Sequence, residues 1–195
     1  MESIEEKKNP QFGRRVLGIG WPAERNGFAV VIGEEAYPTV GSEVYKLHFL
    51  DEAEAKNVNQ LFMLCAELIK KHGISEVIGR RDEHNMGNLY SFNDDHPGSG
   101  FDVGMAPHSK DGRISHHVNI LLERLENETL VLPKDSKLWT QFEKVKVGQT
   151  HVATDAQFPA VAALGYIVAD LTKYPSEIEQ DIYEPPDDVD PTTGY

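Results

Sequence analysis

Three strand-like runs follow one another before any helical pattern begins, and this order does most to limit the folds open to the chain. The runs cover residues 15–19, 27–32 and 43–49, with turn-forming segments between them. Apart from Arg15 the first two are apolar throughout, as in buried strands, whereas the third alternates polar and apolar side chains, as in a half-exposed strand. Consecutive strands joined by turns predict an antiparallel meander.

A helical pattern follows the third run and leads to a fourth strand. Between residues 52 and 72 apolar side chains recur at three- and four-residue spacing, and Gly73 follows as a C-cap. Residues 76–79 are again a short, mainly apolar run. Strands of one sheet that are joined by a helical crossover run parallel, so we expect the fourth strand to lie parallel to the first.

The second half of the chain alternates short strand-like pieces with helices. A polar, turn-rich insert over residues 84–100, with room for a short helix, precedes a fifth strand at 101–105. The remaining expected elements are a helix over 114–126, an extended piece over 129–132, and helices over 136–145 and 157–172. This order predicts an α/β fold with a mixed sheet flanked by helices, and it leaves several folds of that kind open.

Length and composition predict one folded domain with irregular ends. The chain has 195 residues, of which 39% are hydrophobic and 26% charged, as is usual for a soluble domain. We expect a flexible lead-in over residues 1–13, a domain over 14–174, and an acidic, disordered tail over 175–195. The tail holds seven acids and no Lys or Arg, so a net charge of −13 leaves −6 for residues 1–174. An acidic body disfavours nucleic-acid binding, which needs local Lys and Arg.

Cysteine content and hydropathy predict a cytoplasmic protein with no membrane partner. Cys65, the only cysteine, cannot form an intrachain disulfide, and its place in a helical apolar stripe favours a role in the core. The longest apolar stretch, residues 158–169, is too short to span a bilayer. HExxH, CxxC and GxxxxGK[ST] motifs are all absent from the sequence, so we predict neither a zinc site nor a P-loop.

Several segments, taken in order, share their pattern with one protein family. Residues 16–22 and 27–31 form a strand, a turn and a second strand, and residues 76–82 form a strand that ends in Arg-Arg-Asp. Residues 100–133 pass from a strand through a Lys/Ser/Gly loop and a helix to a short strand closed by Pro133, and residues 151–156 open the last apolar helix. Together these segments resemble the C-terminal nuclease domain of the large terminase subunit of tailed phages.

The resemblance extends over residues 14–173 and implies a ribonuclease H-like fold. It also implies a role in viral DNA packaging or processing in the host-cell cytoplasm. Double-stranded DNA and packaging-motor or portal proteins are the partners that it implies. The oligomeric state stays open.

The family cleaves DNA with clustered carboxylates that hold two divalent metals, and hard oxygen ligands suit Mg²⁺ or Mn²⁺. Carried over to this chain, the acid of the first strand falls at Gly20 and that of the fourth strand at Arg80. The first acid of the pair at the last helix falls at Thr154, and only Asp155 remains. The resemblance therefore implies a metal site that has lost most of its ligands.

Three hypotheses follow from these replacements. In the first, which we favour, the chain is a degenerate nuclease whose fold persists without metals, and Arg80 pairs with Asp155 because a guanidinium partly replaces metal charge. The alternative function for such a domain is that of a non-catalytic protein- or DNA-binding module. In the second, Asp82 and Glu83 join Asp155, and Glu24 as a further candidate, to hold one Mg²⁺ or Mn²⁺ in a DNA endonuclease. In the third, the resemblance misleads, and the chain has another activity, such as that of a different ribonuclease H-like nuclease or resolvase.

His84 is the histidine best placed to contribute to such a site. It follows Asp82 and Glu83 directly, which makes it a candidate metal ligand or proton shuttle. A surface histidine without a chemical role is the more common case for such a position.

Overall fold

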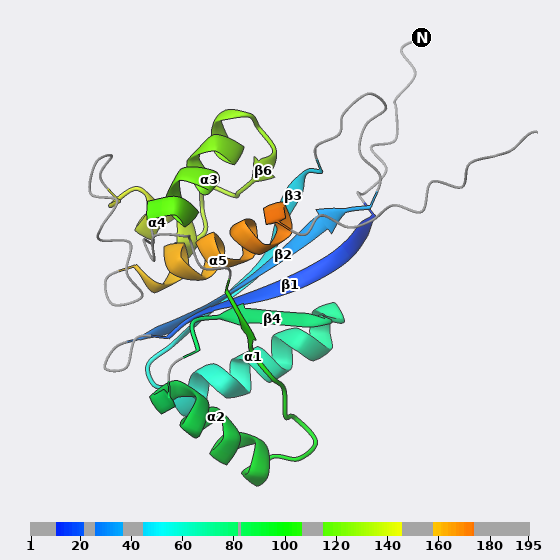
Figure 1. Cartoon of the computed structure of the whole chain (residues 1–195), viewed down its shortest axis with the longest axis vertical. Coiled ribbons are helices and arrows are strands. Elements are labelled where there is room, and N and C mark those ends of the chain that lie inside the picture. Colours follow the sequence, from blue (N-terminus) through cyan, green and yellow to red (C-terminus); the bar gives the residue numbers. More distant parts are fainter. Residues whose placement is uncertain are drawn as a thin grey trace, which may run out of the picture.

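The structure, a computed structural model, describes residues 11–21, 26–36, 45–81, 83–106, 115–145 and 158–173, with the backbone alone for 115–118. Over these ranges the chain forms a six-stranded mixed sheet with helices on both faces (Figure 1). The strands are β1 (Phe12–Gly20), β2 (Gly27–Glu35), β3 (Leu47–Ala55), β4 (Glu76–Gly79), β5 (Gly104–Met105) and β6 (Leu130–Val131). The helices are α1 (Val58–His72), α2 (Glu83–Asp95), α3 (Ser115–Glu126), α4 (Lys137–Phe142) and α5 (Pro159–Lys173).

The strand order is β5-β4-β1-β2-β3-β6. β1, β2 and β3 pair antiparallel, which confirms the predicted meander. β4 lies parallel to β1, as the helical crossover predicts, and β5 lies parallel to β4. β6 adds a parallel strand at the β3 edge. The first strand is therefore at the centre of the sheet, with the meander on one side and the crossover strands on the other.

The boundary between the third strand and the first helix differs from the prediction. β3 runs over Leu47–Ala55, so the acidic residues from 52 onward, which we expected to be helical, continue the strand. Pairing with β2 outweighs the helix preference of Glu and Ala here, since Ala53 and Ala55 lie opposite Ala29 and Gly27. The helix starts instead where Asn57 caps it, its Oδ1 accepting from Gln60 N at 2.9 Å.

Three further expectations need adjusting. The polar insert contains a full helix, α2, of 13 residues, and the fifth strand is only Gly104–Met105. β1 begins at Phe12, inside the segment expected to be a lead-in. Residues 43–44 and the acidic tail lie outside the described residues.

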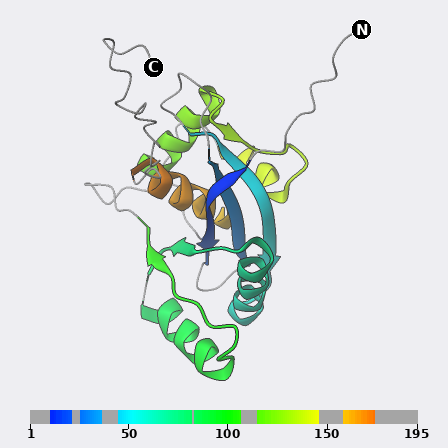
Figure 2. The same ribbon diagram turned by 90° about the vertical axis from the view of Figure 1, so that its right-hand side faces the viewer.

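The sheet separates two hydrophobic cores. α3, α4 and α5 cover one face, and α1 covers the other, with α2 packed on α1 at the opposite end of the molecule from α3 (Figures 1 and 2). Every residue of α5 from 159 to 171 is buried, because this helix lies between the sheet and the other two helices. Cys65 is buried in the α1 core, as predicted, and burial raises the pKa of its thiol.

No helix in the described ranges is both long and apolar enough to cross a membrane.

Candidate functional site

The position that the resemblance gives to the metal site lies where β1 and β4 end side by side. The two strands are parallel, with Ile19 opposite Gly79, so the residues that follow, Gly20 and Arg80, leave the sheet at the same edge. The carboxyl ends of neighbouring parallel strands are where α/β sheets commonly place ligand sites. α5 also begins at this edge, beside β1.

Gly20 has no space for a side chain. A Cβ atom added to it would lie 2.0 Å from the carbonyl oxygen of Pro159 and 2.7 Å from the carbonyl carbon. Real Cβ atoms essentially never approach this closely, so the first turn of α5 fills the volume that a carboxylate would need. Gln141 holds this turn in place, because its Oε1 accepts from Ala160 N at 3.0 Å.

A neighbouring glycine extends the close approach. A Cβ at Gly18, on the same face of β1, would lie 2.4 Å from the carbonyl oxygen of Ala163. The two glycines give β1 a flat surface on which the backbone of α5 rests. The glycine at position 20 is thus coupled to the position of a whole helix.

Trp21 ties the ends of β1 and β4 together. Its side chain is 1% exposed, packs edge-on against Phe62 and donates through Nε1 to the carbonyl oxygen of Arg80 at 2.7 Å. Asn85, buried in α2, donates through Nδ2 to the carbonyl oxygen of Trp21 at 3.1 Å. Because the side chain is buried, we assign Trp21 to packing.

The remaining described residues at this edge do not form a metal site. The side chain of Arg80 is exposed and permanently cationic, and Glu83 is the exposed first residue of α2. His84 is also exposed, with its Nε2 3.3 Å from Nδ2 of Asn88. In the part of the chain that the structure describes, no three His, Cys, Asp or Glu residues come close enough to hold a metal ion. A glycine, an arginine and a single exposed carboxylate do not fit two divalent metals.

Several predicted site residues lie outside the described residues. These are Glu24, Asp82, Thr154 and Asp155. The pairing of Arg80 with Asp155, and a relocated site built from Asp82, Glu83 and Asp155, therefore stay predictions.

Two buried acids that the sequence did not suggest as site residues lie at the other end of the sheet. Asp170 in α5 is 5% exposed and Glu34 in β2 is 2% exposed. Arg14 donates to Asp170 Oδ2 at 3.1 Å and to Glu76 Oε2 at 2.6 Å. The signal in the sequence is one acid, Asp170, that interrupts the apolar run of the last helix. Arg14 gives the Asp170 carboxylate a structural partner, which joins α5 to β1 and β4.

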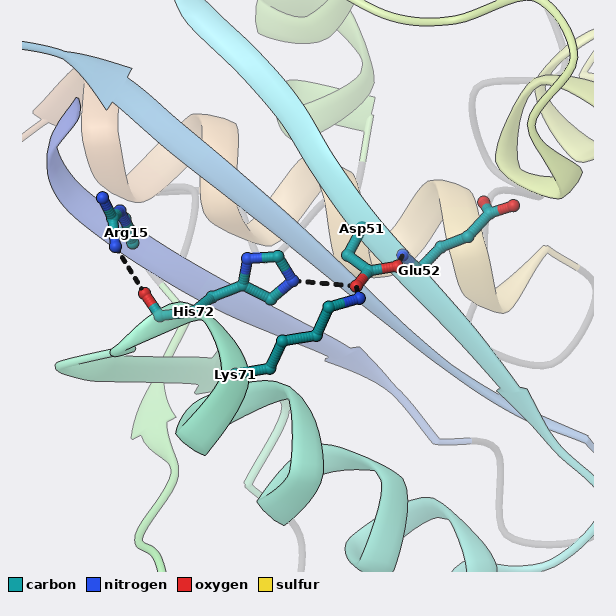
Figure 3. A network of polar contacts seen from close by, with 5 residues as sticks. All are labelled: Arg15, Asp51, Glu52, Lys71 and His72. Atoms are coloured by element: carbon teal, nitrogen blue, oxygen red, sulfur yellow. Dashed lines mark hydrogen bonds and ion pairs between the residues drawn. The ribbon is translucent and has the colours of Figure 1, made fainter. Parts of the chain in front are cut away.

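Asp51 is the centre of a second polar network, which joins α1 to β3 (Figure 3). Its Oδ2 accepts from Lys71 Nζ at 2.7 Å and from His72 Nε2 at 2.8 Å, and its Oδ1 accepts from Glu52 N at 2.9 Å. Arg15 donates to the carbonyl oxygen of His72 at 2.8 Å, so β1 holds the same helix end (Figure 3). Because both carboxylate oxygens already have partners, we assign the network to the attachment of α1.

We expect the Asp51→Asn variant to be less stable by about 1 kcal/mol at pH 7, the usual size of a part-exposed, charge-assisted contact. Burial raises the pKa of Asp51, but hydrogen bonds from Lys71, His72 and the Glu52 amide outweigh it and place the pKa below 3.8. A lowered pKa gives stability that is present above 3.8 and lost as the pH falls through the folded-state value. Urea unfolding should therefore separate the two proteins at pH 7 and less at about pH 3. An equal difference at both pH values would contradict this assignment.

Several solved structures superimpose on this chain. The large terminase of the thermophilic bacteriophage D6E superimposes with a TM-score of 0.57 and 10% sequence identity, over 85% of this chain and 41% of that chain. The same terminase in complex with ATP-gamma-S gives a TM-score of 0.54 and 12% identity, over 83% of this chain and 41% of that chain. The Holliday junction resolvase of fowlpox virus aligns with 82% of this chain and 99% of that chain, but at a TM-score of only 0.43 and 8% identity.

No protein-family model matches the sequence, and no curated protein matches it either. The likeness to the terminase is therefore one of three-dimensional structure, and this chain spans about two fifths of the terminase's length. With its central β1, antiparallel meander, parallel crossover strands and helices on both faces, the chain has the ribonuclease H-like α/β fold that it shares with part of a phage large terminase.

Proposed function

We propose that this chain is a terminase-nuclease-like domain that acts in viral DNA packaging or processing and has lost two-metal DNA cleavage. The single observation that carries the proposal is the space at Gly20, which the backbone of α5 fills. The terminase-like fold supports a role in viral DNA packaging or processing. The residues at the ends of β1 and β4 support the loss of two-metal cleavage.

Two-metal cleavage depends on carboxylates that bring both ions to within about 4 Å of each other. Without a side chain at Gly20, the central strand contributes no ligand at its end. Arg80 adds a positive charge where the neighbouring strand would contribute its carboxylate, and like charges at short range repel a divalent cation. Both changes act in the same direction, so a single substitution does not restore the site.

A domain of this kind serves as a binding module, for DNA or for a motor or portal protein of the packaging machinery. The alternative keeps the chemistry: Asp82, Glu83 and Asp155 hold one Mg²⁺ or Mn²⁺ at a shifted position. The two differ in one respect, which is whether a divalent metal binds in a way that depends on those acids.

The test is incubation of the whole chain with supercoiled plasmid in Mg²⁺ and in Mn²⁺, beside Asp155→Ala and Glu83→Ala variants. We expect no conversion to nicked or linear DNA by any of the three proteins. We also expect no rise in the unfolding temperature when Mn²⁺ is added, because a metal bound by the folded state would stabilise it. Metal-dependent cleavage that disappears in the Asp155→Ala protein would contradict the proposal and support the alternative, in which the acids hold one metal at a shifted position.

A further inference from the structure

A groove between α1 and α2 is lined mainly by uncharged polar side chains. Its volume is about 450 Å³, which falls in the usual range for ligand sites. Asn59 and Gln60 of α1 lie on one wall and Asn88 and Ser91 of α2 on the other. Met63 adds a side chain that is 43% exposed, a flexible apolar contact of the kind found at adaptable binding surfaces.

Two stacked rings form part of the α2 wall of this groove. The rings of Phe92 and His96, which both line it, lie 4.6 Å apart at 20°. Phe92 also packs against Phe62 in the α1 core, with ring centroids 5.4 Å apart. His96 Nδ1 lies 3.1 Å from the carbonyl oxygen of Phe92, which sets the orientation of the imidazole and turns Nε2 away from the helix. A rigid wall of this kind lowers the entropic cost of binding.

The polar groups of the groove match those of a peptide main chain. Among the described residues, the side chains of Asn59, Ser91 and Asp95 have no hydrogen-bond partner. Gln60 uses its Oε1 to accept from Lys56 N at 2.9 Å, which leaves its amide N–H groups to donate. Side-chain amides carry both donors and acceptors, as peptide groups do, so they pair with an extended strand whatever its side chains.

Charge decides between a peptide and a nucleic acid. Asp95 is the one acidic residue of the lining, and no Lys or Arg lines the groove. Phosphate groups need cationic contacts and would be repelled by this carboxylate. A Lys or Arg side chain would instead find an opposite charge.

We propose that this groove binds an extended peptide segment that carries Lys or Arg, from a protein partner. The wall from Asn88 to His96 is roughly 12 Å long at 1.5 Å per helical residue. An extended chain covers that distance with about four residues at ~3.3 Å each. The proposal goes beyond the proposed function, since it concerns the α1–α2 layer and holds whether or not the chain cleaves DNA.

The test is an NMR titration of the ¹⁵N-labelled full chain with a capped five-residue peptide of alternating alanine and lysine, up to about 10 mM. We expect saturable shifts for the backbone amides of Asn59, Asn88 and Asp95. The Asp95→Asn change should weaken binding about 2- to 5-fold, the size of an exposed ion pair. Glu67→Gln removes an exposed acid of α1 outside the groove and is the matched control, with affinity unchanged.

Two probes of similar length separate the alternatives. A capped peptide of alternating alanine and glutamate should bind several-fold more weakly than the lysine peptide, and a five-nucleotide oligothymidylate should cause no saturable shift at these amides. The proposal is overturned if the lysine peptide causes no saturable shift, if the glutamate peptide binds equally well, or if oligothymidylate binds better. It is also overturned if Asp95→Asn and Glu67→Gln have equal effects.

Discussion

Replacing Gly20 with alanine should lower the free energy of unfolding by about 3 kcal/mol, at the upper end of what overpacking costs. The new methyl group would meet the backbone of Pro159 at 2.0 Å, and backbone cannot rotate away as a side chain can. Either the end of β1 or the first turn of α5 must move, and both belong to the core. Urea unfolding followed by fluorescence or circular dichroism measures the loss.

Gly87 provides the matched control for this substitution. It is an exposed glycine within α2, and a Cβ added there meets nothing within 4 Å. Alanine has the better helix propensity, so Gly87→Ala should stabilise the domain by about 0.5–1 kcal/mol. If Gly20→Ala instead stays within about 0.5 kcal/mol of the original protein, α5 does not rest on β1 as described.

The same contact predicts the result of trying to rebuild the site. Gly20→Asp restores the acid that the family resemblance implies at this strand end, but the carboxylate has no volume to occupy. We expect that variant to unfold more readily and to remain unable to cleave plasmid.

The Arg14→Met variant should lose about 2–3 kcal/mol at pH 7. Arg14 is the cation that contacts both Glu76 and Asp170, and Asp170 is almost completely buried. Removing one partner of a buried pair leaves an uncompensated charge, which commonly costs about 3–5 kcal/mol, and the partial exposure of Arg14 reduces this figure. Unfolding by urea at pH 7 measures the effect.

The pH dependence of that variant distinguishes a charge effect from lost packing. Burial and the nearby Glu76 carboxylate raise the pKa of Asp170, and Arg14 and Lys173 oppose them. A carboxyl group with a raised pKa destabilises the fold above its folded-state pKa, and this cost disappears as the pH falls toward the ordinary value of 3.8. The deficit of Arg14→Met should therefore shrink as the pH is lowered from 7 towards 4. Adding Asp170→Asn to the Arg14→Met protein should recover much of the lost stability at pH 7. A deficit that changes neither with pH nor with Asp170→Asn would indicate lost packing alone.

Much of the fold could be predicted because its signals are local. The apolar runs of β1 and β2, the stripe of α1 and the crossover to β4 each follow from a short stretch of sequence. The end of β3 could not, because Ala53 and Ala55 are strand residues only through their pairing with β2. At the end of β3, hydrogen bonding between strands outweighs the local preference for helix.

The candidate site was predictable in part. The sequence alone shows glycine at position 20 and arginine at position 80, but it does not show that α5 occupies the space above Gly20. Residues 20 and 159 are far apart along the chain, and no local pattern joins them. The same holds for the bond from Asn85 to Trp21 and for the placement of Asp170 beside Arg14.

Because Cys65 is buried, its reactivity can report on local unfolding of the α1 layer. Cys65 is the only thiol in the chain and lies on the buried side of α1, on one face of the sheet, whereas α5 covers the other face. A thiol reagent reaches it only when the α1 layer separates from the sheet, so the labelling rate measures the stability of that layer in the unaltered protein. Comparing that rate with global unfolding reveals whether the two faces of the sheet open together or independently.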